Sequence, residues 1–213
     1  MAIYTEQEAR ALLEKVLSYS QADECWVNLD GSEAGNIRYA RNTVSTAGEV
    51  SNVTLAVQSS FGKQTGTATI NEFDDASLEK VVRRSEELAR LAPENPEHMP
   101  MLGPAEYSTV DAWQESTAAM TPAKRAEMAD ASITPSKEND LVAAGYLNDT
   151  RGFSAIANNR GMFAYHKSTN VNFTVTIRTE DGRGSGWVTR DFNDVSKLDT
   201  GAASAIAIQK AKG

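Results

Sequence analysis

The stretch NVTLAVQSSFGKQTGTATINEFDDASLEKVV, residues 52–82, decides the fold. At its start, apolar residues alternate with polar or small ones at the period of a half-buried strand; the apolar set is Val53, Leu55 and Val57. Phe61-Gly62-Lys63 predicts a turn, residues 65–70 return as a strand, and a helix begins at Asp74 or Asp75. The stretch therefore predicts an antiparallel hairpin whose apolar face is covered by the helix that follows.

Helices are predicted on both sides of this region. Thr5 and Glu8 have capping-box spacing at the start of the first helix. Its apolar face is Ala9, Leu12, Leu13, Val16 and Leu17. The helix that follows the hairpin has a stripe predicted to be buried, formed by Leu78, Val81, Val82, Ser85, Ala89 and Ala92, and Pro93 ends it. Further strands are predicted at 25–29 and 37–46.

The second half of the chain repeats this order. Thr121 and Pro122 begin a helix that we expect to end before Pro135. Strands are predicted at 140–148, 153–158, 162–167, 171–177 and 185–190. The last helix is predicted to begin near Asp194 or Ser196, with an apolar face of Leu198, Ala202, Ala205 and Ile206.

The two halves match under a shift of 120 residues. The identical pairs are Asn52/Asn172, Thr54/Thr174, Gly62/Gly182, Gly66/Gly186, Asp74/Asp194 and Leu78/Leu198. Two interpretations stay open: an ancient duplication, or the general likeness of one hairpin-then-helix pattern to another. We predict an α+β fold, mainly antiparallel sheet with helices on one face, built from two helix–four-strand–helix units.

The domain prediction treats residues 1–213 as one N-terminal domain. Its two subunits are 1–92 and 121–213, joined by the proline-rich loop 93–120. On the helices, Leu78, Val82, Leu198 and Ile206 are expected to point at the covered face of the sheet. Polar positions such as Asn52 and Thr174 are expected to face solvent or a further domain.

Charge and cysteine content exclude some classes of function. The net charge of −8 disfavours direct binding to nucleic acid, because an acidic surface repels phosphates. No apolar run is long enough to span a membrane, and Glu6, Glu8 and Glu14 do not fit a signal peptide. The single cysteine, Cys25, cannot form an intrachain disulfide. We therefore expect a cytoplasmic protein with no direct nucleic-acid or membrane partner.

The residues that could carry chemistry give no catalytic, cofactor-binding or metal site. A helical zinc site needs two histidines about one turn apart beside a glutamate, and His98 and His166 are distant and isolated. Cys25 lies in a stretch typical of a core strand. Gly182-Arg183-Gly184-Ser185-Gly186 leads into a strand, so it predicts a hairpin tip rather than a phosphate loop.

The remaining polar candidates have structural interpretations. Helix capping explains most of the aspartates that could pair as carboxylates, Asp74, Asp75, Asp191 and Asp194. Arg83 and Arg84 are balanced by Glu86 and Glu87 at helical spacing, which is typical of a solvated face. The aromatic residues Trp113, Trp187 and Phe192 do not define a stacking platform. We predict that the chain binds no stoichiometric zinc and has no peptidase activity of its own.

The run from Arg38 to Glu97 resembles the N-terminal signature of the TldD/PmbA family, metallopeptidase subunits also called modulators of DNA gyrase. The matching positions are Arg38, Tyr39, Asn42, Gly62, Gly66 and Ala68, and Ile70 departs from the pattern. The stretch 151–177 resembles the family's second strand cluster at Asn158 and Gly161. The resemblance covers residues 5–211.

The resemblance implies a non-catalytic domain that shapes the substrate chamber and subunit contacts of a cytoplasmic peptidase. The full-length assembly would cleave peptides or unfolded proteins, with a homologous subunit as partner in a homo- or heterodimer. Zinc is expected only in a C-terminal half, which this chain lacks, and only in the active branch of the family. The alternative is a free-standing binding or adaptor module without a peptidase role.

Overall fold

The computed structural model describes residues 3–213. Its elements in chain order are α1 (Glu6–Ser18), β1 (Glu24–Ala40), β2 (Thr43–Phe61), β3 (Gln64–Ile70), α2 (Asp75–Leu91), α3 (Glu115–Ala118), α4 (Pro122–Glu138), β4 (Leu141–Asn158), β5 (Phe163–Thr179), β6 (Ser185–Phe192), the 3-10 helix η1 (Val195–Lys197) and α5 (Thr200–Lys212). Hydrogen bonding orders the strands β3-β2-β1-β4-β5-β6. The predicted α+β class with a mainly antiparallel sheet is confirmed.

Each half of the chain contains three strands rather than the predicted four. The predicted segments 153–158 and 140–148 belong to one strand, β4, and 162–167 and 171–177 belong to β5. Over much of each strand, buried residues alternate with partly buried or exposed ones. Short runs of apolar residues therefore mark only parts of long strands, because the weakly apolar stretches between them stay extended and paired.

Two compact units divide the chain, and each draws on three separate stretches. Unit 1 contains the chain up to Ser32 with residues 52–110 and 152–167, and unit 2 contains 33–51, 111–151 and 168–213. Strands β1, β2, β4 and β5 contribute residues to both units. Each unit has its own apolar core.

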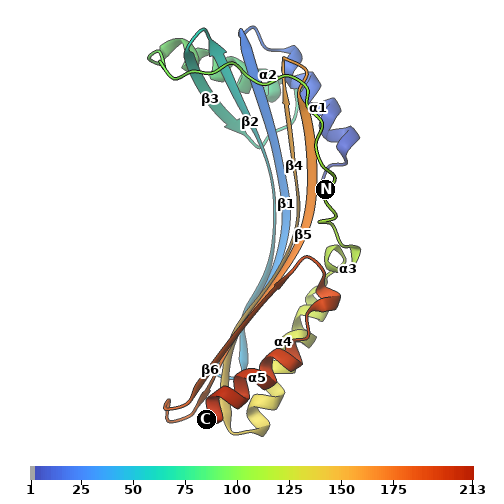
Figure 1. The fold of residues 1–213 in the computed structure, drawn as a ribbon, viewed down its shortest axis with the longest axis vertical. Coiled ribbons are helices and arrows are strands. Elements are labelled where there is room, and N and C mark those ends of the chain that lie inside the picture. Colours follow the sequence, from blue (N-terminus) through green and yellow to red (C-terminus); the bar gives the residue numbers. More distant parts are fainter. Residues whose placement is uncertain (1–2) are drawn as a thin grey trace. The chain divides into compact units, whose positions relative to one another are not determined.

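Unit 1 is built on the hairpin predicted from residues 52–82. β2 pairs antiparallel with β3, from Leu55 opposite Ile70 to Phe61 opposite Gln64. Helix α2 begins after the N-cap Asp74 and packs against β3, with Leu78 and Val82 buried as predicted. Helix α1 contacts α2 (Figure 1) and begins with the predicted capping box.

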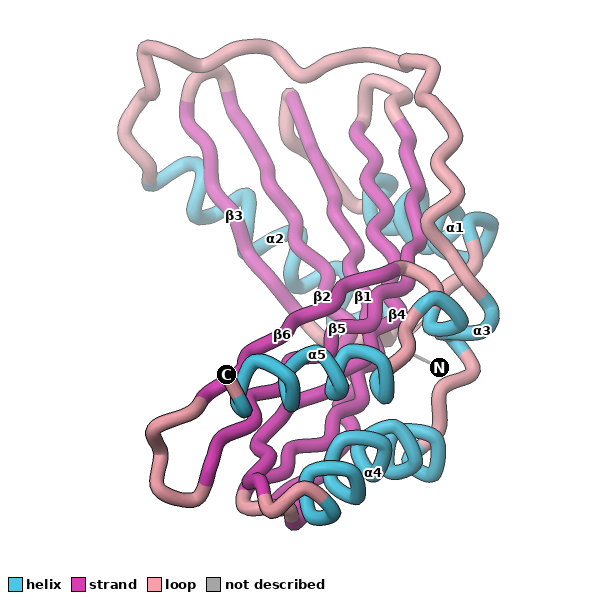
Figure 2. The backbone as a smooth tube through the Cα atoms, turned by 60° about the horizontal axis from the view of Figure 1, so that its bottom comes forward, coloured by secondary structure: helices cyan, strands magenta, loops and turns pink. Residues whose placement is uncertain are grey.

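Unit 2 is built on the second hairpin and two long helices. β5 pairs antiparallel with β6, from Val171 opposite Phe192 to Arg178 opposite Ser185. Helices α4 and α5 contact one another, and α5 runs along β6 (Figure 2). The hydroxyls of Ser132 on α4 and Ser204 on α5 lie 2.6 Å apart in this contact. Small residues on both helices let their backbones approach closely.

The face that α5 buries differs from the predicted one. Ile206 is 38% exposed, and Ala202 and Ala205 are exposed as well. The buried residues of this helix are Thr200, Ala203, Ser204, Ala207 and Ala211. The helix begins at Thr200 after the N-cap Asp199, while Asp194 caps only the short helix η1. Because α5 starts later than we expected, Leu198 lies before the helix and is not part of its face. The face of α5 that meets β6 consists of small residues.

Helix α4 continues past the position where we expected it to end. Pro135 lies inside the helix, which runs to Glu138. Proline lacks an N–H and usually ends a helix at the residue before it. Here the hydroxyls of Ser136 and Thr134 bond within the last turns, to the Ser132 carbonyl and the Asp130 carboxylate. Pro135, the residue that cannot donate a backbone hydrogen bond, therefore lies within one turn of the helix end.

The repeated glycines have matching positions in the two halves. Gly62 and Gly182 both have positive φ, at 56° and 72°, in the turns that end β2 and β5. A Cβ on Gly66 would lie 2.2 Å from the backbone nitrogen of Ala89 on α2. A Cβ on Gly186 would lie 2.0 Å from the carbonyl oxygen of Ala207 on α5. Gly66 therefore lets α2 pack directly on β3, and Gly186 lets α5 pack directly on β6.

No helix among residues 3–213 combines the length and the apolar character that crossing a membrane requires.

Candidate functional site

The residues that carry the family resemblance hold strands and turns in place. Arg41 and Asn42 both have positive φ in the tight turn between β1 and β2. The Asn42 amide donates to the Leu141 carbonyl at 2.8 Å, and its oxygen accepts from the Ala143 N–H at 2.7 Å. Asparagine suits this position, because it tolerates the left-handed backbone and supplies both a donor and an acceptor.

Asn158 has the same kind of role at the β4–β5 turn. Its oxygen accepts from the N–H groups of Arg160 and Met162, and its amide donates to the Leu102 carbonyl at 2.8 Å. Gly161 follows with a φ of 84°. The recurring asparagine and glycine are therefore turn residues.

His98 is held in a buried ionic cluster with Glu24. Its Nε2 lies 3.1 Å from Glu24 Oε2, and the Glu24 side chain is only 7% exposed. The other carboxylate oxygen accepts from the Met101 N–H at 3.0 Å and pairs with Arg160 at 2.6 Å. The cluster ties the proline-rich stretch to β1 within unit 1.

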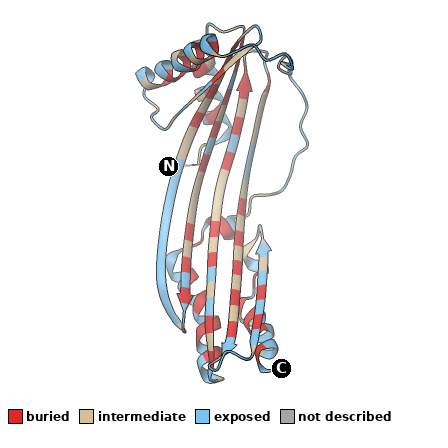
Figure 3. Ribbon diagram, turned by 90° about the vertical axis from the view of Figure 1, so that its left-hand side faces the viewer, coloured by how far each residue is buried: buried red, intermediate tan, exposed pale blue. Residues whose placement is uncertain are grey.

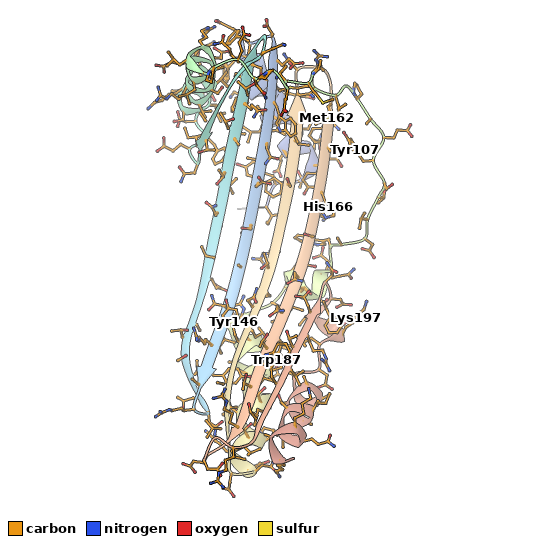
Figure 4. All side chains as sticks on the ribbon, turned by 60° about the vertical axis from the view of Figure 1, so that its left-hand side comes forward. Tyr107, Tyr146, Met162, His166, Trp187 and Lys197 are labelled. Carbon is orange, nitrogen blue, oxygen red and sulfur yellow. The ribbon has the colours of Figure 1, made fainter. Side chains whose placement is uncertain are left out.

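His166 and Cys25 lie apart from this cluster. His166 is exposed on β5 (Figure 4). Cys25 is buried, and burial raises the pKa of its thiol, which makes it a weak nucleophile. Among residues 3–213, no three side chains of histidine, cysteine, aspartate or glutamate come close enough to hold a metal ion.

The glycine-rich stretch 182–186 is a hairpin tip that leads into β6. The four aspartates have no partner in common. Asp74 caps α2 and Asp194 caps η1. Asp75 pairs with Lys15, and Asp191 accepts from the side chains of Asn170 and Asn172. Capping therefore explains two of them, and the aspartates do not form a paired-carboxylate site.

The remaining predicted surface features are only partly solvated. Arg84 pairs with Glu87 on the exposed side of α2, as expected. Arg83 pairs with Glu86, but the Glu86 side chain is 2% exposed and also accepts from the Gln21 N–H at 2.6 Å, so the prediction of a solvated face is wrong there. Trp187 is 55% exposed on β6 (Figure 4), and its indole lies on the opposite face from Gly186 and α5. Trp113 donates to Glu115.

The strongest cluster of charges lies in unit 2, around Arg125 of α4. The Arg125 side chain is 5% exposed. Its Nε and Nη2 donate to the two carboxylate oxygens of Asp149 on β4, at 2.5 and 3.1 Å, and its Nη1 donates to Glu49 on β2 at 2.9 Å. The Asp149 hydrogen bond raises the pKa of Arg125. The planar guanidinium therefore links one helix to two strands.

Gly35 makes room for this guanidinium on β1. A Cβ at Gly35 would lie 1.7 Å from Arg125 Nη2. Any side chain here would displace the guanidinium from Asp149, so the cluster depends on the glycine. Arg151 pairs with Glu33 beside it.

A cavity of about 200 Å³ lies against the cluster. It is lined by Glu33, Ala34, Gly35, Glu49, Val50, Ser51, Met120, Arg125, Asp149 and Arg151. The guanidiniums and carboxylates offer hydrogen bonds and charge. They provide no activated nucleophile, so the arrangement suits binding or support rather than bond cleavage.

Sequence reasoning missed this cluster. Arg125 lies in a predicted helix, and nothing in the local pattern links it to its partners, which are 24 and 76 residues away. The sequence signal that could have drawn attention to it is Gly35, between the predicted strands 25–29 and 37–46. A glycine inside a strand often marks a close approach.

Comparison with known families matches residues 115–212 to the PmbA/TldA metallopeptidase central domain. The matched region contains α4, β4, β5, β6 and α5. No curated protein sequence matches the chain.

Solved structures share the fold. TldE from Thermococcus kodakarensis aligns with a TM-score of 0.87 and 15% identity, over 94% of this chain and 47% of that one. A proposed modulator of a DNA gyrase from Thermotoga maritima aligns with a TM-score of 0.84 and 12% identity, over 95% and 47%. A proposed modulator of DNA gyrase from Bacteroides thetaiotaomicron aligns with a TM-score of 0.79 and 15% identity, over 99% and 50%.

The fold and the matched region define an α+β protein of the class seen in TldE. Residues 115–212 match a TldD/PmbA family domain, and most of the chain shares the fold of TldE, which supports the resemblance seen in the sequence. The chain spans about half the length of the solved relatives.

Proposed function

We propose that this chain serves as a non-catalytic domain of a TldD/PmbA metallopeptidase assembly. In this role it shapes the substrate chamber and the contacts with a homologous subunit, and the full assembly cleaves peptides or unfolded proteins. Residues 1–213 act together as the N-terminal part of a subunit in this proposal, and residues 115–212 of this part match the family's central domain. Zinc, in an active member of the family, is bound outside this chain.

The observation that carries the proposal is the match of residues 115–212 to a domain described by its metallopeptidase family. The charge cluster supports a structural role for the same region. Arg125 and Asp149 fall inside the match, and together they join α4 to β4 through a neutralised pair. This pair fixes the position of α4 on β4, and neither group is an activated nucleophile, which is consistent with a supporting role in the proposed assembly.

The test measures association and hydrolysis separately. The purified chain is mixed with a full-length TldD/PmbA subunit that has its own zinc site, and the complex is isolated by size-exclusion chromatography. We expect a stable complex, and cleavage of an unfolded casein probe only in fractions that contain the full-length subunit. The chain alone, with or without added zinc, is expected to leave the probe intact.

Two results would contradict the proposal. Cleavage by the chain alone that disappears in His98→Ala or His166→Ala would place catalysis in these residues. Failure to associate with family subunits would favour the alternative, a free-standing binding or adaptor module.

A further inference from the structure

The first half of β2, residues 43–51, forms a sheet edge with no strand beside it on one side. β3 pairs with β2 only from Leu55 to Phe61. Within residues 3–213, the N–H and C=O groups of 43–51 that point away from β1 therefore have no strand partner. All nine residues are exposed, and Figure 3 shows this strand in pale blue.

This edge has little of the usual protection against pairing. Edge strands are normally blocked by lysine, proline or short length. The sequence TVSTAGEVS contains neither lysine nor proline, and its one charge is Glu49. The opposite edge strand, β6, has eight residues and carries Arg190 and Asp191. The β2 edge is therefore open to strand addition in a way that β6 is not.

Two hollows accompany the edge on the side of α4. One, of about 280 Å³, lies between Ala47 and Gly48 of the strand and Pro122 of the helix. The other is the cavity of about 200 Å³ beside the Arg125 cluster. Glu49 and Arg125 line both. Alternate side chains of an added strand would point toward α4, where these hollows could receive them.

The charge of the smaller hollow favours a cationic side chain, whereas the charges that line the larger one, Glu49 and Arg125, cancel. Two guanidiniums, Arg125 and Arg151, face three carboxylates in the smaller hollow, which leaves one negative charge. The Glu49 side chain is 61% exposed. It therefore lies within reach of a side chain on an added strand, while the buried Arg125 keeps its two bonds to Asp149.

We propose that the β2 edge binds an extended segment of a partner protein by strand addition, with a lysine or arginine of that segment facing Glu49. A second copy of this chain fits less well. Its own β2 edge would present Ala47, Glu49 and Ser51 to the hollows, and these residues are small or acidic. This inference goes beyond the proposed peptidase role, because it requires binding only.

The test uses two fluorescein-labelled peptides of about nine residues, the length of the open edge. One carries lysine at alternate positions between threonine and valine, and the matched peptide carries glutamate in place of lysine. Binding is measured by fluorescence anisotropy, and amide hydrogen exchange locates it. We expect the lysine peptide to slow exchange in residues 43–51 and to leave β6 unchanged.

A charge swap tests the role of Glu49. Glu49→Lys should weaken binding of the lysine peptide about tenfold. The same variant should bind the glutamate peptide more tightly than the wild-type protein does. Glu180→Lys, an exposed change of the same charge in the β5–β6 turn, should leave both affinities unchanged. Exchange protection elsewhere in the variant shows that it is folded.

Four results would overturn the proposal. The first is lysine-peptide binding that leaves hydrogen exchange in 43–51 unchanged, and the second is no binding at millimolar peptide. The third is equal weakening of binding by Glu49→Lys and Glu180→Lys, which would indicate a general charge effect. The fourth is protection of 43–51 that rises with protein concentration alone, which would make a second copy of the chain the occupant.

Discussion

At the scale of single residues, the buried pair of Arg125 and Asp149 is the most consequential interaction in unit 2. Both side chains are largely removed from water, and each compensates the charge of the other. A buried ion pair adds little net stability over apolar residues, but loss of one partner leaves a charge without compensation. The main effect of the pair is therefore to fix the position of α4 on β4.

Replacement of one partner should cost more than replacement of both. We expect Arg125→Met to lower the free energy of unfolding by about 3–5 kcal/mol, because Asp149 would be left buried and unpaired. Arg125→Met combined with Asp149→Leu should recover a large part of that loss. Urea denaturation of the three proteins gives the comparison. A double variant as unstable as the single one would show that the charge itself is not the cause.

Two glycines of the second hairpin are required for different reasons. Gly186 lets α5 approach the strand, whereas Gly182 supplies a left-handed turn with open space around it. We expect Gly186→Ala to lower the free energy of unfolding by about 3 kcal/mol, because the new Cβ would overlap the Ala207 carbonyl. Gly182→Ala, the matched control, should cost only about 1 kcal/mol. Thermal and urea unfolding measure both variants. An equal loss of unfolding free energy in Gly186→Ala and Gly182→Ala would contradict the role of close packing at Gly186.

At the scale of elements, helix starts are set by side chains that accept hydrogen bonds. Thr5 and Glu8 form a reciprocal box at α1, and Asp74 accepts from the Ser77 N–H at 3.0 Å at α2. The hydrogen bonds from Ser77 hold the pKa of Asp74 below its usual value. The carboxylate form of Asp74 is therefore favoured in the folded protein.

This depressed pKa predicts how acid affects α2. A carboxyl whose folded pKa is lowered stabilises the fold above its unfolded pKa, and that contribution is lost as pH falls through the folded value. Asp74→Asn keeps a capping side chain that does not titrate. We expect the stability of wild type relative to Asp74→Asn to decline from pH 7 to pH 3 in urea denaturation. Asp74→Ala should be less stable than the wild type at pH 7, and a pH-independent difference between wild type and Asp74→Asn would contradict the assignment.

At the scale of the whole molecule, two cores form from interleaved stretches of chain. Each core has its own hairpin and its own helix, and the helix rests on the return strand through a glycine. The matching roles of Gly62 with Gly182 and of Gly66 with Gly186 are what a duplication would produce. They are also what any hairpin covered by a helix needs, so both interpretations remain open.

The whole chain should hold no stoichiometric zinc. His98 is engaged with Glu24, His166 is exposed, and Cys25 is buried, so these three potential ligands are in different surroundings. Elemental analysis of the purified chain after dialysis should find far less than one zinc per chain. One tightly held zinc per chain, lost in His98→Ala, would contradict the prediction.

The sequence by itself determined the local elements of this protein. The alternation at 53–57, the turn at Gly62 and the caps at Thr5 and Asp74 each depend on residues a few positions apart, so their pattern is visible along the chain. The antiparallel hairpins and the helix that covers the first of them followed from these signals. The family resemblance followed too, because its residues are turn and packing positions.

Only the tertiary structure decided which distant residues meet. It showed that Arg125 pairs with Asp149 and Glu49, that α5 buries its alanine face rather than Ile206, and that half of β2 stays an open edge. Each of these depends on where one element comes to rest on another. A helix can bury more than one face, and a strand can be central or at an edge, with the same local sequence, so the choice belongs to packing.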